Sequence, residues 1–82
     1  MNIEIYTLET CPYCIRAKSL LKKRGLVFKE FILEINDEEA WEDLEQKTGV
    51  ETVPQIFHKG KFIGGCSDLE VLDAKDNLES LK

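Results

Sequence analysis

The fold is decided at residues 2–25, which read NIEIYTLETCPYCIRAKSLLKKRG. Residues 2–7 alternate apolar with polar side chains, and this alternation predicts a β-strand. Residues 12–24 repeat apolar side chains at every third or fourth position, which predicts a helix, with Pro12 in its first turn and Gly25 as its C-terminal stop. The stretch therefore predicts a strand followed by a helix, with two cysteines at the junction.

Further along the chain, the same signals predict a strand, a helix, a hairpin of two strands and a final helix. Their expected bounds are residues 26–32, residues 36–47, residues 55–58 with 61–64, and a helix that starts at Ser67. Leu78 and Leu81 are expected to extend this helix or to follow it as a further turn. The order β-α-β-α-β-β-α makes the first two strands parallel, because a helix lies between them, and makes the hairpin strands antiparallel. The expected fold is α/β, with a mixed four-stranded sheet and helices on both faces.

The two later helices carry capping signals. Asn36, three residues before Glu39, is expected to cap the first of them, and the S-x-x-E box from Ser67 to Glu70 is expected to start the second. In the first of these helices, the side chains expected to point inward are Ala40, Trp41 and Leu44. The acidic residues of the surrounding stretch 34–51 are then expected to form a solvated face.

Length and charge bound the class of protein. The chain has 82 residues, which suits a single domain over residues 1–82, and it carries 16 acidic against 11 basic residues, for a net charge of −5. This balance excludes a fold-wide basic surface, so no nucleic-acid partner is expected. No apolar run reaches the length of a membrane span, and the N-terminus lacks a secretion-signal pattern. We therefore expect a cytoplasmic monomer with no membrane partner.

The cysteine pattern indicates either redox or metal chemistry. The chain has three cysteines, an odd number that does not suggest a disulfide framework, and Cys11 and Cys14 form a C-x-x-C. A zinc site needs further ligands, for which the chain offers Cys66 and His58, and these share no short motif. Pro12 also stiffens the loop that would have to wrap a metal. Redox chemistry is the favoured interpretation, with a metal site and inert cysteines as the alternatives.

The two cysteines are expected to have different roles. Cys11 occupies the cap position of the predicted helix, where unpaired backbone N–H groups and the helix dipole favour a thiolate. Arg16 and Lys18, in the next turn, add positive charge nearby. Cys14 lies one turn later and points back under Cys11 toward the body of the protein. Cys11 is therefore predicted to be the nucleophile and Cys14 the resolving thiol.

Three segments resemble the signature segments of the dithiol glutaredoxins, in particular the short bacterial glutaredoxin-3-like proteins. They are Cys11-Pro12-Tyr13-Cys14, Thr52-Val53-Pro54 and Gly64-Gly65-Cys66-Ser67-Asp68. The resemblance covers essentially the whole chain and implies a thioredoxin-like fold. It also implies an enzyme that reduces protein–glutathione mixed disulfides and small disulfides. Glutathione would be its cosubstrate, and no tightly bound cofactor is expected.

The resemblance further implies a glutathione site. In the family the peptide bond that corresponds to Val53–Pro54 is cis, and the exposed backbone of Val53 would pair with the cysteinyl part of glutathione. The γ-glutamyl carboxylate would lie at the N-terminus of the last helix, near Cys66 and Ser67, and Asp68 would hold the ammonium group. The residues expected to bind glutathione are Tyr13, Thr52, Val53, Pro54, Gly65, Cys66, Ser67 and Asp68.

Leu8 departs from the family pattern, because many glutaredoxins carry there a lysine that is thought to attract a glutathione carboxylate. This leaves open a redoxin that thioredoxin reductase reduces and that serves ribonucleotide reductase or a peroxidase. An iron–sulfur or metal-binding module is an alternative of another class. Plainer interpretations also stay open for single residues: a strand-start proline for Pro54, a small filler for Cys66, an exposed ring for Tyr13 and a capping residue for Asp68.

Overall fold

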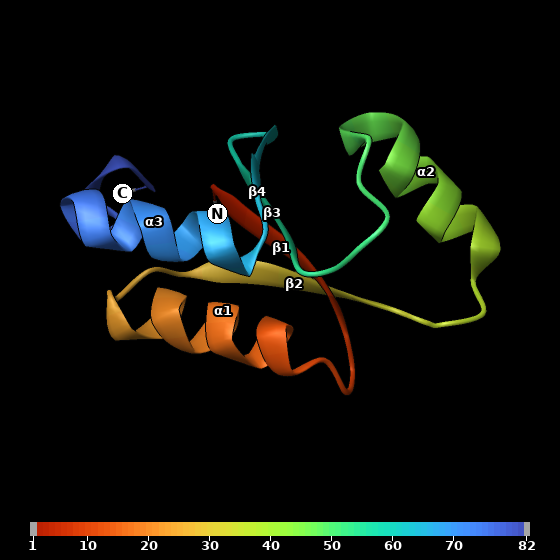
Figure 1. The fold of residues 1–82 in the computed structure, drawn as a ribbon, viewed down its shortest axis with the longest axis horizontal. Helices are drawn as coiled ribbons and strands as arrows, with labels where there is room; N and C mark the ends of the chain where they lie inside the picture. Colours follow the sequence, from red (N-terminus) through yellow and green to blue (C-terminus); the bar gives the residue numbers. More distant parts are fainter. Residues whose placement is uncertain (1, 82) are drawn as a thin grey trace.

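The computed structural model describes residues 2–81, and Figure 1 shows how its elements are arranged. In chain order they are β1 (Ile3–Leu8), α1 (Pro12–Lys23), β2 (Phe28–Leu33), α2 (Glu38–Thr48), β3 (Gln55–His58), β4 (Lys61–Gly64), α3 (Cys66–Asp76) and a 3-10 turn, η1 (Glu79–Leu81). The predicted order is confirmed, and the predicted bounds differ from the observed ones by one or two residues at most.

The sheet has the strand order β2-β1-β3-β4, so β1 lies inside it. β1 runs parallel to β2 over its whole length and antiparallel to β3, and β3 and β4 form an antiparallel hairpin. Lys59 and Gly60 connect the hairpin with φ angles of 53° and 80°, a turn whose twist matches that of the strands. The predicted mixed sheet is therefore confirmed. Because β3 begins opposite the end of β1, the segment just before Gln55 lies near the C-x-x-C.

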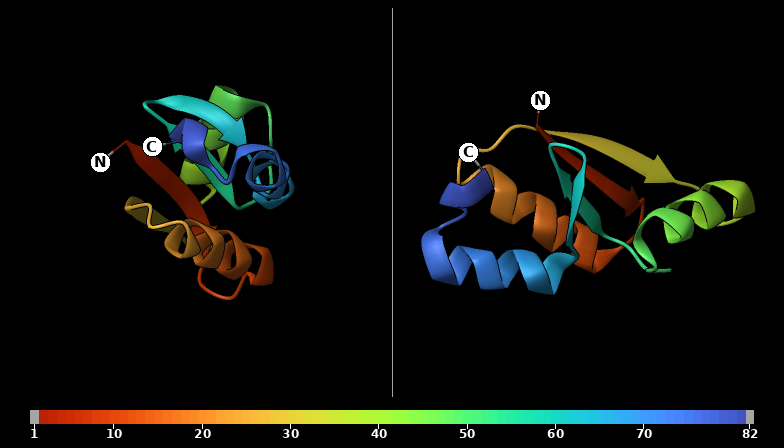
Figure 2. Two further views of the ribbon diagram at one scale, coloured as in Figure 1. Left: turned by 90° about the vertical axis from the view of Figure 1, so that its left-hand side faces the viewer. Right: turned by 90° about the horizontal axis from the view of Figure 1, so that it is seen from above.

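Helices α1 and α3 lie side by side over one face of the sheet (Figures 1 and 2). The core between them and the strands is formed by Ile3, Ile5, Ala17, Leu21, Ile56, Cys66, Leu69, Leu78 and Leu81. Each large aliphatic side chain removed from water in this way stabilises the fold by about 1.5–3 kcal/mol. Leu78 and Leu81 are buried, so the predicted further turn after α3 closes the core.

The second face of the sheet carries a row of aromatic rings, with Tyr6 stacked on Phe31 at 4.9 Å and in edge contact with Phe57. Helix α2 lies on this side, toward the ends of β1 and β2 (Figure 2), where its residues line surface hollows with Tyr6 and Leu8. Helices on both faces are therefore confirmed. Within residues 2–81, no helix is both long and apolar enough to cross a bilayer.

Helix α2 buries fewer of its side chains than the sequence predicts. Leu44 is buried, but Ala40 and Trp41 are only half-buried. The Trp41 ring is held at the surface because its Nε1–H donates to the Glu34 carbonyl at 2.9 Å. The expectation that Trp41 points into the core is therefore corrected: α2 lies beyond the end of the strands, where less sheet surface is available to cover a large ring.

Two predicted helix caps are also corrected. Asp37, rather than Asn36, caps α2, and its carboxylate accepts the Ala40 N–H at 3.2 Å. Helix α3 begins one residue earlier than expected, with Gly65 as its N-cap and with Asp68, not Glu70, closing the box by accepting the Gly65 N–H at 3.0 Å. The physical reason is the position of the cap: a capping box joins the N-cap to the third helical residue, which is Asp68 when Gly65 is the N-cap. The Glu70 carboxylate forms an ion pair with Arg16 of α1.

Candidate active site

Cys11 occupies the N-cap of α1, as the sequence predicts. Its backbone is extended (φ −92°, ψ 113°), and Pro12 takes the first helical position, where no backbone N–H is required. The Cys11 Sγ accepts the backbone N–H of Cys14 at 3.4 Å, so one of the unpaired donors at the helix end points at the sulfur. A donor in this position stabilises negative charge on sulfur, and Cys11 is also partly open to solvent.

Cys14 has the opposite environment. It is fully buried beneath the first turn of α1, next to Ala17 and the core. Burial, followed by the hydrogen bond with Cys11, raises the pKa of Cys14 to about 12. The structure thus places one accessible sulfur and one shielded thiol a single helical turn apart, both as free cysteines.

The two cations expected to assist Cys11 are engaged elsewhere. Arg16 forms an ion pair with Glu70 of α3, and Lys18 donates to Glu30 of β2 at 2.9 Å. Their charge still acts on the neighbouring thiols, because Lys18 partly offsets the rise in the pKa of Cys14 and Arg16 partly offsets that of Cys66. Their effect on Cys11 itself stays a prediction. The helix terminus is the feature in direct contact with the sulfur.

The segment before β3 faces Cys11. The Val53–Pro54 peptide bond is cis, as the resemblance implies, and the Cys11 Sγ lies 3.9 Å from the Val53 carbonyl oxygen. Gln55 holds this segment from below: its side chain is fully buried, and its Nε2 donates to the carbonyls of Val50 and Thr52 at 2.9 Å each. No role was predicted for Gln55, although an amide side chain at the start of an apolar strand is the sequence signal that could have identified it.

The N-terminus of α3 forms the opposite wall. Gly64 has a φ of 130°, and a Cβ at this position would lie 2.3 Å from the Asp68 Oδ2, so only glycine fits beneath the capping carboxylate. Ser67 and Asp68 are exposed, whereas Cys66 is buried. Burial, and next the charge of Glu70, raises the pKa of the Cys66 thiol, which favours its interpretation as a core filler over a third redox centre.

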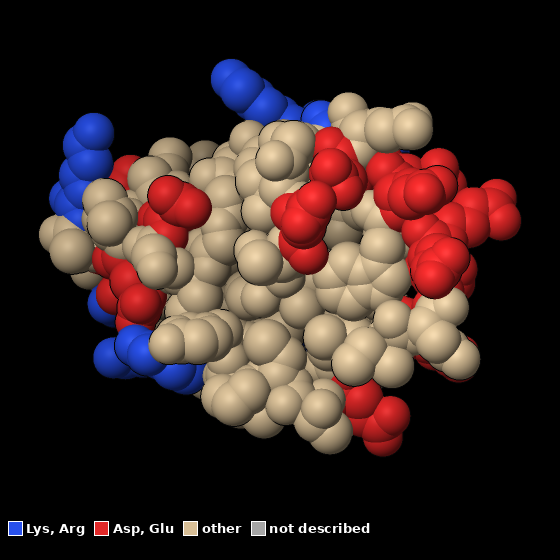
Figure 3. Space-filling view, turned by 45° about the vertical axis from the view of Figure 1, so that its right-hand side comes forward, with Lys and Arg blue, Asp and Glu red and all other residues tan. Residues whose placement is uncertain are grey.

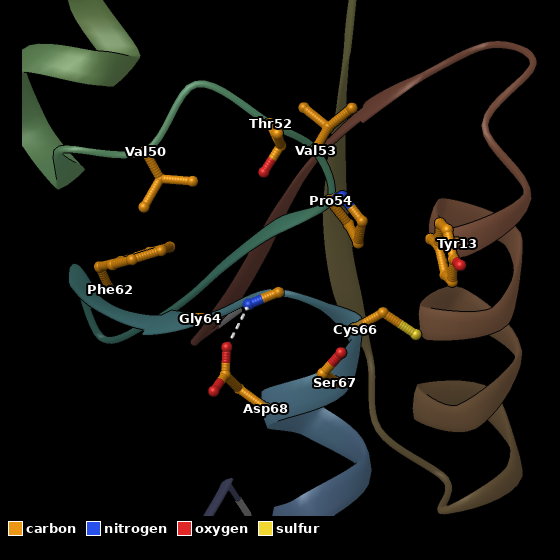
Figure 4. A pocket seen from close by; sticks show the side chains of 11 residues that line it. Tyr13, Val50, Thr52, Val53, Pro54, Phe62, Gly64, Cys66, Ser67 and Asp68 are labelled. Atoms are coloured by element: carbon orange, nitrogen blue, oxygen red, sulfur yellow. Dashed lines mark hydrogen bonds between the residues drawn. The ribbon is translucent and has the colours of Figure 1, made fainter.

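These walls enclose a pocket of about 390 Å³ beside the C-x-x-C (Figure 4). All eight residues expected to bind glutathione line it: Tyr13, Thr52, Val53, Pro54, Gly65, Cys66, Ser67 and Asp68. Three further residues line it: Val50, Phe62 and Gly64, of which only Gly64 belongs to a signature segment. Val50 comes from the loop after α2 and Phe62 from β4, and only the folded chain brings these two to the pocket.

The residues of the alternative metal site do not come together. His58 lies at the far end of β3, opposite Ile3 at the start of β1, whereas the C-x-x-C follows the end of that strand. Within residues 2–81, no group of three or more His, Cys, Asp or Glu side chains is arranged to hold a metal ion. The geometry thus provides a dithiol with an adjacent pocket, which suits thiol–disulfide exchange with a small thiol.

Comparisons with known proteins agree with this geometry. A family model described as Glutaredoxin matches residues 3–63. Glutaredoxin 3 of Escherichia coli (strain K12) is 49% identical over 80 residues, which are 98% of this chain and 95% of that protein. The glutaredoxin of Pseudomonas aeruginosa is 42% identical over 79 residues, which are 96% of this chain and 93% of that protein.

Solved structures confirm the thioredoxin-like fold. Wheat glutaredoxin superposes with a TM-score of 0.90 at 34% identity, covering 99% of this chain and 78% of that one. A buckwheat glutaredoxin–glutathione complex superposes with a TM-score of 0.88 at 28% identity, covering 98% of this chain and 74% of that one. The chain therefore belongs to the glutaredoxin family, whose members are glutathione-dependent thiol–disulfide oxidoreductases.

Proposed function

We propose that Cys11 is the nucleophile and Cys14 the resolving thiol in the reduction of protein–glutathione mixed disulfides and small disulfides. The observation that carries this proposal is the contrast between the partly exposed Cys11 sulfur, which accepts a helix N–H, and the buried Cys14 thiol, whose pKa is raised to about 12. Cys11 reacts first because the thiolate is the attacking species and only this sulfur is accessible to a disulfide.

The first step exchanges one disulfide for another. The Cys11 thiolate attacks the glutathione sulfur of the mixed disulfide, and the substrate thiolate leaves and takes up a proton. A second glutathione, as thiolate, then attacks the glutathione sulfur on Cys11, which releases glutathione disulfide and restores the Cys11 thiolate. In the dithiol route Cys14 loses its proton and attacks the Cys11 sulfur, so that glutathione leaves and a Cys11–Cys14 disulfide forms. Family members have reduction potentials of about −200 to −230 mV, which the glutathione pool can reduce.

The pocket beside Cys11 is the proposed glutathione site. The Val53 backbone would pair with the cysteinyl unit, and the N-terminus of α3 at Cys66 and Ser67 would receive the γ-glutamyl carboxylate. Asp68 both caps α3 through its Oδ2 and lines the pocket, so it can hold an ammonium group while it caps the helix. The glutathione complex of the buckwheat glutaredoxin supports this ligand for the same fold.

Substitution of each cysteine tests the assignment. Cys11→Ser is expected to lose deglutathionylation of a glutathionylated peptide, because no accessible nucleophile remains. Cys14→Ser is expected to retain it, because glutathione itself resolves the adduct, and to lose the dithiol route. Activity of Cys11→Ser near that of the wild type would refute the roles proposed here.

Glutathione is the proposed electron donor. The proposed protein partners are glutathionylated or disulfide-containing proteins, and an oxidised ribonucleotide reductase would be one of them. Turnover with glutathione and its reductase, compared with thioredoxin reductase and NADPH, distinguishes the two donors. We also propose that the protein acts as a cytoplasmic monomer, since the reaction draws on a reduced glutathione pool. Cell fractionation and sedimentation test this placement and this state.

A further inference from the structure

A second surface hollow, of about 440 Å³, lies next to the active site and has no role in the reaction described above. Its floor is apolar and consists of Leu8, Ile35 and Trp41. Its rim is acidic and consists of Glu38, Glu42, Glu45 and Glu51. We call these seven residues the acidic groove. Figure 3 shows acidic side chains gathered on one side of the molecule.

The floor of the acidic groove is not part of the core. Ile35 is 84% exposed, and Leu8 and Trp41 are each half-buried. The Trp41 ring is fixed at the surface by its hydrogen bond to the Glu34 carbonyl, so the floor is already ordered without a partner. An apolar floor of this kind loses water favourably when another apolar side chain covers it.

The rim carries four carboxylates close together. Within residues 2–81, the structure shows no ion pair that involves Glu38, Glu42, Glu45 or Glu51. The charge of Glu51, followed by a hydrogen bond with its side chain, raises the pKa of the neighbouring Glu45, as expected where two carboxylates lie close together. Lysine or arginine side chains placed on the rim would offset this negative charge.

The groove is joined to the active site at two points. The Leu8 carbonyl accepts the Cys11 backbone N–H at 3.4 Å, so the floor lies one turn from the nucleophile. Glu51 precedes Thr52, which lines the glutathione pocket, so the two hollows lie on either side of one loop. A polypeptide whose cysteine sulfur reacts at Cys11 therefore has its neighbouring residues beside the groove.

We propose that the acidic groove docks the segment of a protein substrate that flanks its reacting cysteine, and that it selects segments in which lysine or arginine surrounds an apolar side chain. The apolar floor takes the apolar side chain, and the rim pairs with the cations. Small disulfides do not reach the groove and are insensitive to it. This inference rests on the proposed function and adds the class of protein substrate to it.

Two glutathionylated peptides of equal length test the proposal. One carries Lys-Leu-Lys beside its cysteine, and the other carries Glu-Leu-Glu. The wild type is expected to reduce the basic peptide with a kcat/KM about 2- to 25-fold higher at low salt, the effect of two exposed ion pairs. The ratio is expected to fall as salt is added, because exposed charges are screened. Equal values for the two peptides, or a preference for the acidic one, would overturn the proposal.

Matched variants of α2 separate the groove from the net charge. Glu42→Gln with Glu45→Gln removes two rim charges and is expected to abolish most of the preference. Glu39→Gln with Asp43→Asn removes two charges from the same helix outside the groove and is expected to preserve it. Equal loss of the preference in both double variants would show an effect of overall charge and would overturn the groove as the docking site.

A further pair of variants tests the apolar floor of the groove, and a small disulfide substrate tests the reaction itself. Ile35→Ser is expected to lower kcat/KM for the basic peptide, whereas Val71→Ser, at a residue of α3 that is 65% exposed, is expected to leave it unchanged. All these variants are expected to reduce 2-hydroxyethyl disulfide with glutathione as the wild type does. Normal turnover of this small disulfide without peptide selectivity overturns the docking proposal alone. Failure of the wild type to turn it over overturns the proposed function, and the docking proposal with it.

Discussion

At the scale of single residues, the site depends on two cysteines that differ only in where the helix places them. Position 11 is the cap, where the sulfur meets a backbone N–H and remains partly exposed. Position 14 is one turn into α1, where the side chain points into the core and burial raises its pKa to about 12. The Cys11 sulfur is therefore suited to attack a disulfide, and Cys14 is suited to remain a protonated thiol until it resolves the adduct.

The first prediction concerns selective alkylation. Reduced protein treated with one equivalent of iodoacetamide at pH 7 is expected to be labelled at Cys11 in preference to Cys14 and Cys66. The reason is that both of the latter thiols are buried and have raised pKa values. Mass mapping of the digested protein measures the distribution of label, and preferential labelling of Cys14 or Cys66 would contradict the assignment.

The second prediction separates the two roles of Asp68. Asp68→Asn keeps an oxygen that can cap Gly65 but removes the charge. It is expected to raise the KM for glutathione about 1.4- to 5-fold, the effect of one exposed ion pair, and to change stability little. Asp68→Ala loses the cap as well and is expected to destabilise the protein by about 0.5–2 kcal/mol. Steady-state kinetics and urea unfolding measure the two effects, and an unchanged KM in Asp68→Asn would leave Asp68 as a capping residue only.

At the scale of elements, polar bridges hold the first helix in place. Arg16 of α1 pairs with Glu70 of α3, and Arg24, the C-cap residue of α1, pairs with Asp73 of α3. These two ion pairs join the two helices on the same face of the sheet. On the sheet side, Glu30 of β2 receives hydrogen bonds from Lys18 at 2.9 Å and from the buried Thr7 of β1 at 2.7 Å. This second bridge ties α1 to both parallel strands close to the C-x-x-C.

The third prediction concerns the pH dependence of the Glu30 bridge. The hydrogen bond from Lys18, followed by that from Thr7, lowers the pKa of Glu30 in the folded state. Because the pKa of Glu30 is lower in the folded state, the bridge stabilises the protein fully at a pH above the pKa of Glu30 in the unfolded chain, which is roughly 4.3. This stabilisation is lost as the pH falls through the pKa of Glu30 in the folded protein. Glu30→Gln is therefore expected to cost about 1–2 kcal/mol at pH 7 and progressively less below about pH 4.

Urea unfolding of both proteins at pH 7 and pH 3 measures this difference. Glu34→Gln provides the control, because Glu34 is exposed and its side chain takes no part in the bridge. A stability loss in Glu30→Gln that is as large at pH 3 as at pH 7 would show that the cost comes from packing and not from the charge.

At the scale of the whole molecule, one core supports two hollows at the same end. The glutathione pocket and the acidic groove share the loop over residues 50–54, and the groove also includes Leu8 at the end of β1. The opposite end is closed by the chain after α3, where Leu78 and Leu81 complete the core. The stability of the site therefore depends on residues remote from it in sequence and in space.

The fourth prediction concerns this C-terminal closure. Leu78 is fully buried, so Leu78→Ala is expected to destabilise the protein by about 2–4 kcal/mol, through lost burial and the cavity left behind. The melting temperature of a domain of this size is expected to fall by about 8–30 °C. Val71→Ala, at a residue that is 65% exposed, is expected to change stability by less than about 0.5 kcal/mol. Thermal unfolding followed by circular dichroism measures both, and equal losses would contradict a closing role for the C-terminal turn.

Most of the fold and the centre of the site were readable from local patterns. The alternation in residues 2–7 and the helical period after Pro12 act over a few residues, so they identify β1 and α1 without the rest of the chain. The C-x-x-C at their junction places Cys11 at the cap for the same local reason. The helix between β1 and β2 predicts that these strands run parallel, and the short turn between β3 and β4 predicts that they run antiparallel. The observed strand pairing confirms both orientations.

The order of elements, the mixed sheet and the position of the two cysteines at the start of α1 therefore follow from local sequence patterns, since each depends on short-range backbone geometry. The contacts between segments that are distant in the sequence depend on how the folded chain places them. Asp68 caps α3 because the turn from β4 makes Gly65 the N-cap, which puts Asp68 at the third helical position. Gln55 supports the loop before β3 because the fold buries its amide under two carbonyls. The acidic groove, too, exists only where the end of β1 meets α2, because surfaces built from distant segments have no signature in any one of them.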